Sequence, residues 1–333
     1  MKNGKLAESV LQRSVLKQLH QGKSASVGAD CAFFTPGNDQ VLAWCVQEAA
    51  VAVQAGRGEL TRLFVKAANN LAAAGAVPVS AQLALMLPVE CEETAVKMLM
   101  EQAVMACGEL KMELAGGDTN VSRAVSMPIA SVTAIGTVKQ GERHDLSLAK
   151  AGQDLVLSKW IGLEGTAILA ETYHKVLSER YPAYLVEEAA GFDKMLSVIP
   201  EAKIACANGA CALHDLSQGG VFGALWELAE GSRLGLTADL KKIPIRQETV
   251  EVCEVCGVNP YEMRSGGSLL MTAQDGMALV EALEKEGIPA AVIGKLTDSR
   301  DRMIVHGEEI RYLDRPRGED SISILADTCD LAK

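Results

Sequence analysis

The chain has 333 residues, of which 48% are hydrophobic and 23% charged, so it can bury the cores of about two domains. Its net charge of −11, from 43 acidic residues against 32 Lys and Arg, argues against binding nucleic acid or a membrane through a broad positive field. Nine scattered cysteines and an N-terminus without an apolar core argue against a disulfide framework and a signal peptide, so we expect a cytoplasmic protein.

Apolar periodicity predicts alternating helices and strands in the first half of the chain. The run "VKAANNLAAAGAVPVSAQLALMLP" (65–88) has no charge after Lys66, but Asn69 and Asn70, with glycine and proline, interrupt it. We therefore interpret it as an Ala-rich helix, a turn at 75–78 and a buried strand rather than a membrane span. The other elements predicted here are helices at 5–20 and 92–110 and strands at 41–46, just before Gly116 and at 127–138.

The second half begins after a polar, turn-rich stretch (139–154), which we interpret as a linker. The elements predicted after it are a strand in "DLVLSKWIG" (154–162), helices over 164–199, a strand, glycine turn and helix over 210–232, a β-α-β unit over 268–296 and a hairpin about His306. The alternation in both halves predicts an α/β or α+β fold with two domains, 1–148 and 149–333.

The strongest local signal is Gly116-Gly117-Asp118-Thr119, which we expect at the end of a strand. Glycines let a backbone approach a ligand and offer it N–H groups, while Asp118 could hold a Mg²⁺ ion bridged to phosphates. The alternative is an ordinary turn in which Asp118 hydrogen-bonds its own backbone.

Three further groups have a functional and a structural interpretation each. Gly28 and Asp30 fit either a ligand site or a turn entering a strand. The stretch from His214 and Asp215 to Gly219 and Gly220 fits a ligand cleft, or a capping box in which Asp215 pairs with Gln218. Cys253 and Cys256 have zinc-ligand spacing, but they also fit the buried face of a helix ended by Gly257, which we favour.

Taken in chain order, several segments together resemble the AIR synthase (PurM)-like superfamily of ATP-dependent enzymes. This superfamily includes thiamine-monophosphate kinase, selenophosphate synthetase and HypE, the carbamoyl dehydratase of hydrogenase maturation, and the second half is most similar to the HypE branch. The segments are "GADCAFF" (28–34), "NNLAAAGAVP" (69–78), "LAGGDTN" (114–120), "WIGLEGTAIL" (160–169), "HDLSQGGVFGALWELAEGS" (214–232), "IPIRQETVEVCEVCGVNP" (243–260) and "RSGGSLLM" (264–271).

The resemblance implies a two-domain PurM-like fold that binds MgATP between its domains. An N-terminal mixed-sheet α/β domain would bind ATP and form a homodimer, and a C-terminal α/β domain would complete the cleft. The implied metal ligands are Asp30 and Asp118. The implied nucleotide-binding residues are Lys5, Gly28, Asp30, Asn69, Asn70, Gly116, Gly117, Asp118, Thr119, His214, Asp215, Gly219 and Gly220.

This sequence departs from the family's metal-binding pattern at several carboxylates. Ala29 stands for the first Asp of an Asp-Asp pair, Gln47 for a strand-end Asp, and Asn70 for the Asp of an Asn-Asp pair. Amides keep an oxygen but no charge, so we expect a weakened Mg²⁺ site. The family's terminal cysteine also has no direct equivalent, because Cys329 lies four residues before the end of the sequence.

Two hypotheses follow from the resemblance. The first is an ATP-binding protein, an ATP-dependent activation or dehydration enzyme of hydrogenase-maturation type, which acts with a maturation partner protein. The second is a catalytically silent homologue, a pseudoenzyme that serves as a scaffold, regulator or heterodimer partner. The catalytic residues are left open in both, and neither involves nucleic acid or a membrane.

Overall fold

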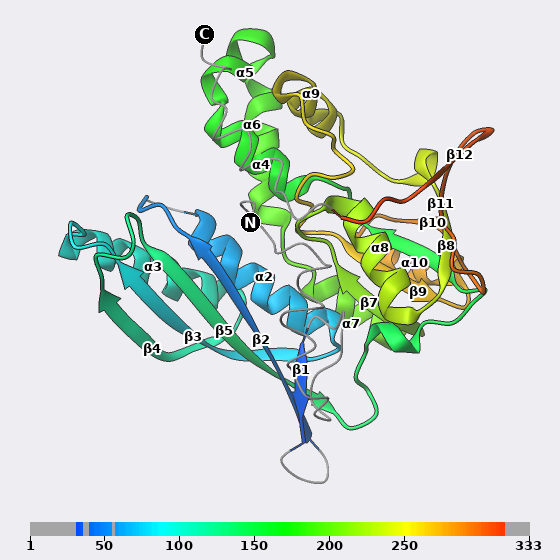
Figure 1. Ribbon diagram of the computed structural model, residues 1–333, viewed down its shortest axis with the longest axis horizontal. Helices are drawn as coiled ribbons and strands as arrows, with labels where there is room; N and C mark the ends of the chain where they lie inside the picture. The colour runs from blue at the N-terminus through cyan, green and yellow to red at the C-terminus, as the bar shows by residue number, and fades with distance from the viewer. Residues whose placement is uncertain (1–30, 36–39, 55–56, 317–333) are drawn as a thin grey trace. The chain divides into compact units, whose positions relative to one another are not determined.

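The computed structural model describes residues 31–35, 40–54 and 57–316. These residues form two compact units, which divide between Arg143 and His144. Each unit is built on one β-sheet with helices packed against it (Figure 1). The predicted α/β class is therefore confirmed, whereas the helix predicted at 5–20 lies outside the described residues.

The N-terminal unit (31–143) is a mixed five-stranded sheet in the order β1-β2-β5-β3-β4, with two helices packed on one face. Only the β3–β4 pair is parallel, and β4 forms one edge of this sheet. Its elements are β1 (Ala32–Phe34), β2 (Gln40–Ala50), α2 (Glu59–Ala73), β3 (Val77–Leu87), α3 (Glu93–Glu109), β4 (Glu113–Val121) and β5 (Ile129–Lys139).

The uncharged run forms the helix α2, a short turn and the strand β3, as predicted. The long alanine-rich stretch favours helix, and α2 buries Cys45 of β2, whose thiol donates to the carbonyl of Ala67 at 3.3 Å. The prediction that β3 is wholly buried is wrong. Its residues alternate, because α2 and α3 cover one face while Val77 and Met86 remain exposed on the strand.

The C-terminal unit (144–316) contains a seven-stranded sheet in the order β12-β11-β8-β10-β6-β9-β7. Its strands are β6 (Asp154–Ser158), β7 (Ala210–Asp215), β8 (Gly235–Asp239), β9 (Leu269–Ala273), β10 (Ala290–Thr297), β11 (Arg302–His306) and β12 (Glu309–Tyr312). Its helices are η2 (Leu146–Leu148), α4 (Leu163–Thr172), α5 (His174–Arg180), α6 (Ala183–Gly191), η3 (Phe192–Met195), α7 (Ile199–Ala207), α8 (Gly220–Ser232), η4 (Leu240–Lys242), α9 (Gln247–Cys256) and α10 (Gly276–Lys285).

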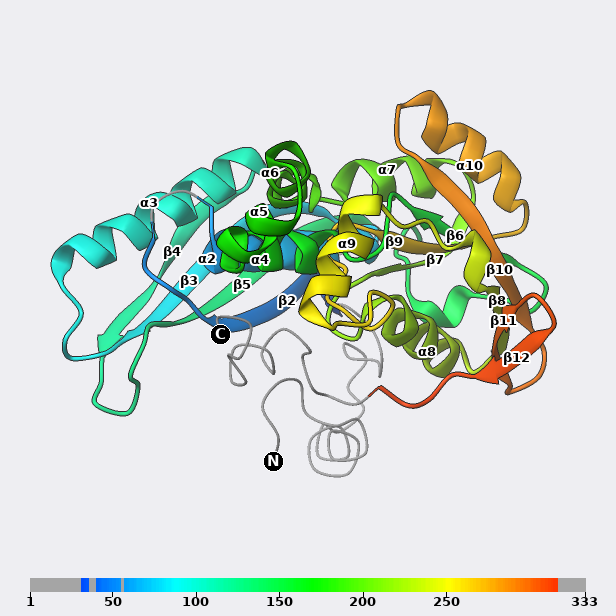
Figure 2. The ribbon, with the colours of Figure 1, turned by 90° about the horizontal axis from the view of Figure 1, so that it is seen from above.

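Helices cover both faces of this sheet, so its central strands are buried on both sides (Figure 2). The helix α8 packs on one face, and α7 and α10 pack on the other. The predicted β-α-β unit is β9–α10–β10, with β6 inserted between its two strands. The predicted hairpin is also present, and it pairs His306 of β11 with Glu309 of β12.

A separate helical layer of the C-terminal unit packs α4, α5, α6 and α9 together. Cys253 and Cys256 lie in its apolar core, and α9 ends at Gly257, whose φ is 65°. The structural interpretation of this cysteine pair is therefore confirmed. Within the described ranges, no helix is both long and apolar enough to cross a bilayer.

Candidate functional site

Three glycine-containing loops of the C-terminal unit meet at one end of the seven-stranded sheet. They are residues 159–165 after β6, residues 216–220 after β7, and residues 263–268 before β9. β9 lies between β6 and β7 and runs antiparallel to both, so these three strand ends are neighbours. We call the three loops together the glycine-loop cluster.

Backbone hydrogen bonds join the loops of the glycine-loop cluster to one another. The first and third loops are joined because Gly162 N donates to Ser265 Oγ at 2.9 Å and Gly165 N donates to the Arg264 carbonyl at 3.1 Å. The second and third loops are joined because Ser265 N donates to the Ser217 carbonyl at 3.2 Å and Leu216 N donates to the Ser268 carbonyl at 3.0 Å. Loops with such shared bonds hold their backbone polar groups in fixed positions, as a ligand-binding site requires.

Gly220 explains why one of these loops needs glycine. Its φ is 63°, and a Cβ built there would lie 2.4 Å from the Tyr261 carbonyl oxygen and 2.7 Å from that of Met263. Any side chain at position 220 would therefore collide with the backbone carbonyls of Tyr261 and Met263, and the collision could be relieved only by moving their loop. Gly219, which precedes it, has a φ of 88° and is the N-cap of α8.

His214 and Asp215 end β7 and are both buried. The His214 Nε2 atom lies 3.0 Å from Glu227 Oε2 of α8, so the imidazole is held between the strand and the helix. The capping box suggested for Asp215 and Gln218 is wrong, because α8 begins only at Gly220 and its N-cap makes no side-chain hydrogen bond.

Glu164 is a charged member of the glycine-loop cluster that residue patterns alone did not single out. Its carboxylate is largely buried in the first turn of α4, where Oε2 accepts from Gly266 N at 3.2 Å. Arg264 Nη1 lies 3.6 Å from Oε1. The sequence feature that could have indicated this role is the stretch "GLEG", because small residues beside a glutamate let its carboxylate approach backbone amides.

A cavity of about 410 Å³ opens beside the N-terminal end of α8. This volume lies in the range of small-molecule sites, roughly 300–1,000 Å³. Gly219 and Gln218 of the glycine-loop cluster line it, with carboxylates, guanidinium groups and aromatic rings from α8, the segment between α9 and β9, the β11–β12 hairpin and the segment after β12. The principal polar and aromatic lining residues are Phe222, Glu227, Glu262, His306, Glu309, Arg311, Tyr312, Asp314 and Arg315.

The predicted residues that the structure describes in the N-terminal unit do not gather on one face of its sheet. Asn69 and Asn70 lie in the last turns of α2 and are buried, at 2% and 8% exposure. Asp118 is exposed and pairs across the sheet with Ala84, which points away from the face covered by α2. The structure therefore places Asp118 and Asn70 on opposite faces of the sheet.

The prediction that Gly116-Gly117-Asp118-Thr119 follows the strand is wrong, because all four residues lie inside β4. A Cβ at Gly117 would lie 1.8 Å from the Leu83 carbonyl oxygen, so this glycine permits the close approach of β4 to β3. The Asp118 carboxylate accepts from Thr119 N at 3.0 Å and from Asn120 Nδ2 at 2.6 Å.

The residues described here offer little to a magnesium ion. Lys5, Gly28 and Asp30 lie outside the described residues. Among residues 31–35, 40–54 and 57–316, no three His, Cys, Asp or Glu side chains gather in a way that could hold a metal. Mg²⁺ is usually held by one or two carboxylates plus substrate phosphates, so Asp118 alone does not make a protein-built site.

Two family models match this chain in tandem. The model of the AIR synthase related protein N-terminal domain matches residues 28–138, and that of the C-terminal domain matches residues 150–306. The chain therefore belongs to the AIR synthase related protein family, and the predicted resemblance is confirmed.

Individual relatives place the chain near hydrogenase maturation proteins. It is 28% identical to a hydrogenase expression/formation protein of Methanocaldococcus jannaschii over 95% of each chain. It is 24% identical to the carbamoyl dehydratase HypE of Rhodobacter capsulatus over 68% of this chain and 66% of the relative.

Solved HypE structures share the fold. HypE in a HypE–HypF complex superposes with a TM-score of 0.75 and 18% identity, covering 92% of this chain and 99% of that one. HypE in complex with ATP gives 0.72 and 16%, covering 94% and 96%. The PurM-like fold is thereby confirmed.

Proposed function

We propose that this chain is an ATP-binding protein of the hydrogenase-maturation branch, with an unusually weak dependence on Mg²⁺. The observation that carries the proposal is its likeness to a hydrogenase expression/formation protein over 95% of both chains. A solved relative with the same fold is a HypE in complex with ATP. The activity proposed is an ATP-dependent activation or dehydration carried out in the cytoplasm.

The glycine-loop cluster supports the binding of a ligand in the C-terminal unit. Gly219 lines the cavity of about 410 Å³, and the first amides of α8 lie beside it. A helix N-terminus with glycine-rich backbone is a common anion-binding arrangement. We propose that His214, Asp215, Gly219 and Gly220 contribute to the nucleotide site, as the sequence predicted.

The weak Mg²⁺ dependence rests on the chemistry of Gln47 and Asn70, which stand where the family resemblance implies carboxylates. A unit-charge pair at 4 Å contributes about 4 kcal/mol in a protein-like dielectric, and roughly twice that for a divalent ion, so each carboxylate replaced by an amide removes a large attraction. Phosphoryl and carboxyl activation depend on such charge in the transition state. We therefore expect slow chemistry even where nucleotide binding persists.

We propose a homodimer formed through the open face of the N-terminal sheet. Val46, Met86, Ile129 and Ile135 are exposed on β2, β3 and β5, on the face opposite α2. An exposed apolar face of this kind is typical of a protein interface. A maturation partner is also proposed, since one solved relative forms a HypE–HypF complex.

The alternative proposal is a catalytically silent homologue that acts as a scaffold, regulator or heterodimer partner. One specific observation favours it: in the described parts of the chain no acidic cluster could hold a metal, and Asp118 is already hydrogen-bonded to its neighbours. Loss of metal ligands affects catalysis more than folding, so the fold would persist without the activity.

A thermal-shift measurement with ATP, with and without Mg²⁺, separates the two proposals. A ligand that binds the folded state stabilises it by about 2.7 kcal/mol at a concentration of 100 Kd. The nucleotide proposal predicts a rise in melting temperature that grows with ATP concentration. An unchanged melting temperature at millimolar ATP in both conditions leaves the scaffold proposal.

A further inference from the structure

A short segment between α6 and α7 contacts two of the three loops of the glycine-loop cluster. It consists of η3 and the turn that follows, residues 192–197, and we call it the support segment. Phe192 and Leu196 are buried, at 1% and 3% exposure, so the segment is packed into the C-terminal unit. The support segment contains none of the residues proposed for the nucleotide site, so any effect that it has on that site is indirect.

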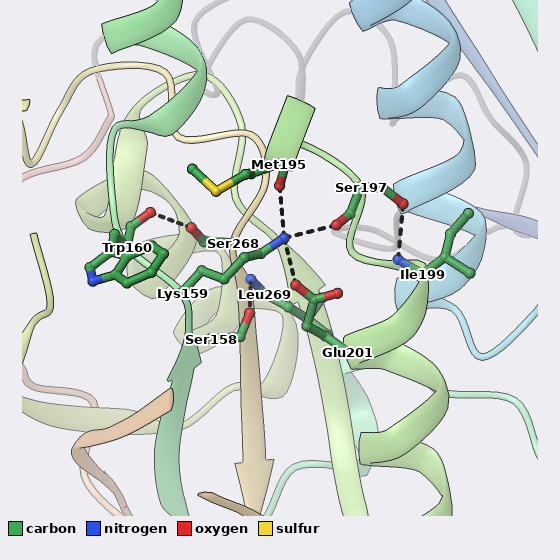
Figure 3. A network of polar contacts seen from close by, with 9 residues as sticks. All are labelled: Ser158, Lys159, Trp160, Met195, Ser197, Ile199, Glu201, Ser268 and Leu269. Atoms are coloured by element: carbon green, nitrogen blue, oxygen red, sulfur yellow. Dashed lines mark hydrogen bonds and ion pairs between the residues drawn. The ribbon is translucent and has the colours of Figure 1, made fainter. Parts of the chain in front are cut away.

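Lys159, the first residue of the first loop, binds the support segment through its side chain (Figure 3). Nζ donates to the carbonyls of Met195 and Ser197, both at 2.8 Å, and lies 2.5 Å from Oε1 of Glu201 in the first turn of α7. An ammonium group has three N–H donors, so these three oxygens use its full donor capacity. The two charged side chains are 11% and 2% exposed, so this link is buried as well as directional.

The third loop packs directly on the support segment. Gly267 has a φ of 102°, and a Cβ there would lie 3.0 Å from Leu196 Cα and 3.1 Å from the Met195 carbonyl oxygen. The next residue, Ser268, donates from Oγ to the Trp160 carbonyl at 2.6 Å (Figure 3). The contacts therefore form a closed ring, from the first loop through the support segment to the third loop and back to the first.

Arg246 holds the other end of the support segment. Its guanidinium carbon lies 5.5 Å from the centre of the Phe192 ring and 5.1 Å from that of the Trp160 ring. A cation within about 6 Å of an aromatic face is attracted to it. The carboxylates of Glu188 and Glu248 bind the same guanidinium group, which fixes its orientation. Arg246 therefore joins one ring of the support segment to one ring of the first loop.

The unfavourable terms at Lys159 indicate a positional role. Its backbone φ is 52°, in the left-handed region that residues with a side chain disfavour. Burial lowers the pKa of Lys159, whereas the Glu201 carboxylate acts in the opposite direction, so desolvation opposes the charged form. Buried ion pairs contribute little net stability compared with apolar residues of similar size. What this pair adds is a set of directional bonds between the first loop and the support segment.

We propose that Lys159 and Arg246 are positioning residues for the nucleotide site, because they hold the support segment against the first and third loops of the glycine-loop cluster. This inference rests on the proposed function, since it concerns the geometry of that site. The third loop passes the constraint to the second, because Ser265 N donates to the Ser217 carbonyl at 3.2 Å. The second loop carries Gly219, which lines the cavity.

The first test is Arg246→Met, which removes the guanidinium group and leaves an apolar side chain between the two rings. The Arg246 side chain is 28% exposed, so we expect this variant to fold. Its matched control is Arg180→Met. Arg180 also pairs with a glutamate of α9, Glu254 at 3.3 Å, and also lies near an aromatic ring, that of Tyr181 at 5.8 Å. These partners lie outside the glycine-loop cluster, so the control should leave the cluster unchanged.

The measurement without nucleotide is amide hydrogen exchange in the full chain, which reports local opening. We expect the amides of residues 263–268 to exchange about tenfold faster in Arg246→Met and at the wild-type rate in Arg180→Met. Calorimetric titration of ATP is the functional measurement, and the Kd should rise about tenfold in Arg246→Met alone, because a binding site loses affinity when its loops are displaced. Wild-type exchange of residues 263–268 in Arg246→Met would overturn the proposal.

The second test is Lys159→Met, which leaves the Glu201 carboxylate buried without its partner. Such a loss is strongly destabilising, and we expect the melting temperature to fall by roughly 6–20 °C. Leu279→Ala is the control for lost stability, since Leu279 is fully buried in α10 and its truncation should lower the melting temperature by a similar amount. The helix α10 begins near the opposite end of the sheet, where Gly276 N donates to Asp154 at the start of β6.

Only Lys159→Met should speed exchange in residues 263–268 and weaken ATP binding. The same changes in Leu279→Ala would refute the positioning role, because they would follow from lost stability alone. Glu201→Gln covers the case in which Lys159→Met does not fold. Its amide keeps an oxygen for the ammonium and removes the charge, so exchange in residues 263–268 should still be faster than in the wild type, and an unchanged rate would count against Lys159.

The two measurements keep this proposal separate from the proposed function. If the wild-type protein does not bind ATP, the proposed function fails, and the exchange rates still decide whether Lys159 and Arg246 hold the loops. If the wild type binds ATP and Arg246→Met binds it equally tightly, the positioning role is refuted while the proposed function stands.

Discussion

Gly220→Ala tests whether close backbone approach holds the glycine-loop cluster together. The new Cβ would lie 2.4 Å from the Tyr261 carbonyl oxygen and 2.9 Å from the Glu262 carbonyl carbon, both backbone atoms. The matched control is Gly209→Ala, whose φ is 81° and whose Cβ would meet no other atom within 4 Å. Both variants place alanine in a left-handed conformation, and only Gly220→Ala adds a collision.

The expected loss of stability follows from these two contributions. The left-handed conformation costs about 1–2 kcal/mol in both variants. Overpacking against backbone adds about 1–3 kcal/mol in Gly220→Ala, for a total of roughly 2–5 kcal/mol. Since 1 kcal/mol shifts the melting temperature of a domain of this size by about 2–4 °C, the two variants should be clearly separated.

The assay is thermal unfolding followed by tryptophan fluorescence, because Trp160 and Trp226 both lie in the C-terminal unit. Gly220→Ala should also weaken ATP binding, whereas Gly209→Ala should leave it unchanged. Equal destabilisation of the two variants would refute the reasoning, since it would mean that the loops adjust to a Cβ at Gly220 without cost.

Three other predictions concern different parts of the molecule. Asn70→Asp should lower the free energy of unfolding by about 1–3 kcal/mol without Mg²⁺, because position 70 is buried. The same variant should bind ATP more tightly in the presence of Mg²⁺ when measured by calorimetry, and an unchanged affinity would mean that position 70 does not face the metal. Ile135→Lys places a charge on the exposed apolar face and should convert the dimer to a monomer in light scattering. A dimer that persists would mean that this face is not the interface. Burial raises the pKa of Cys253 to about 12, and the pKa of Cys107 and Cys256 to about 11, so these thiols stay protonated in the folded state at a pH where the unfolded thiols, with a pKa near 9, ionise. Urea melts should therefore show a free energy of unfolding that falls as the pH rises above about 9, and Cys256→Ala should make that fall less steep.

Periodicity predicted the elements whose apolar pattern is regular. The helix at 92–110 and the β-α-β unit at 268–296 are present because their apolar residues recur at spacings that only one secondary structure satisfies. The exposure of β3 could not be predicted, because its residues other than Ser80 and Gln82 are apolar on both faces. An apolar residue on an open sheet face has the same sequence signature as one in a core.

The glycine pairs show why the site was only partly predictable. Gly116-Gly117 has the composition of a ligand-binding turn, yet Gly117 serves the pairing of β4 with β3. Gly219 and Gly220 have a similar composition, and they do lie beside a cavity. The difference depends on which backbone approaches each glycine, a long-range property that a local motif does not encode.

Lys159 and Glu201 had no local signal at all. They are separated by a run of helices in the sequence, and each residue is by itself an ordinary surface type. Only the fold brings the Glu201 carboxylate to Lys159, the first residue of the glycine-loop cluster. Buried pairs of this kind are therefore recognised from coordinates rather than from composition.

Calorimetric titration of ATP into the wild-type protein, once with Mg²⁺ and once with a chelator, tests the proposed function most directly. We predict saturable binding in both conditions, with an affinity gain from Mg²⁺ of less than about tenfold, or about 1.4 kcal/mol. An absence of binding at millimolar ATP, or binding that depends strictly on Mg²⁺, would contradict a nucleotide site from which metal-binding charge has been lost.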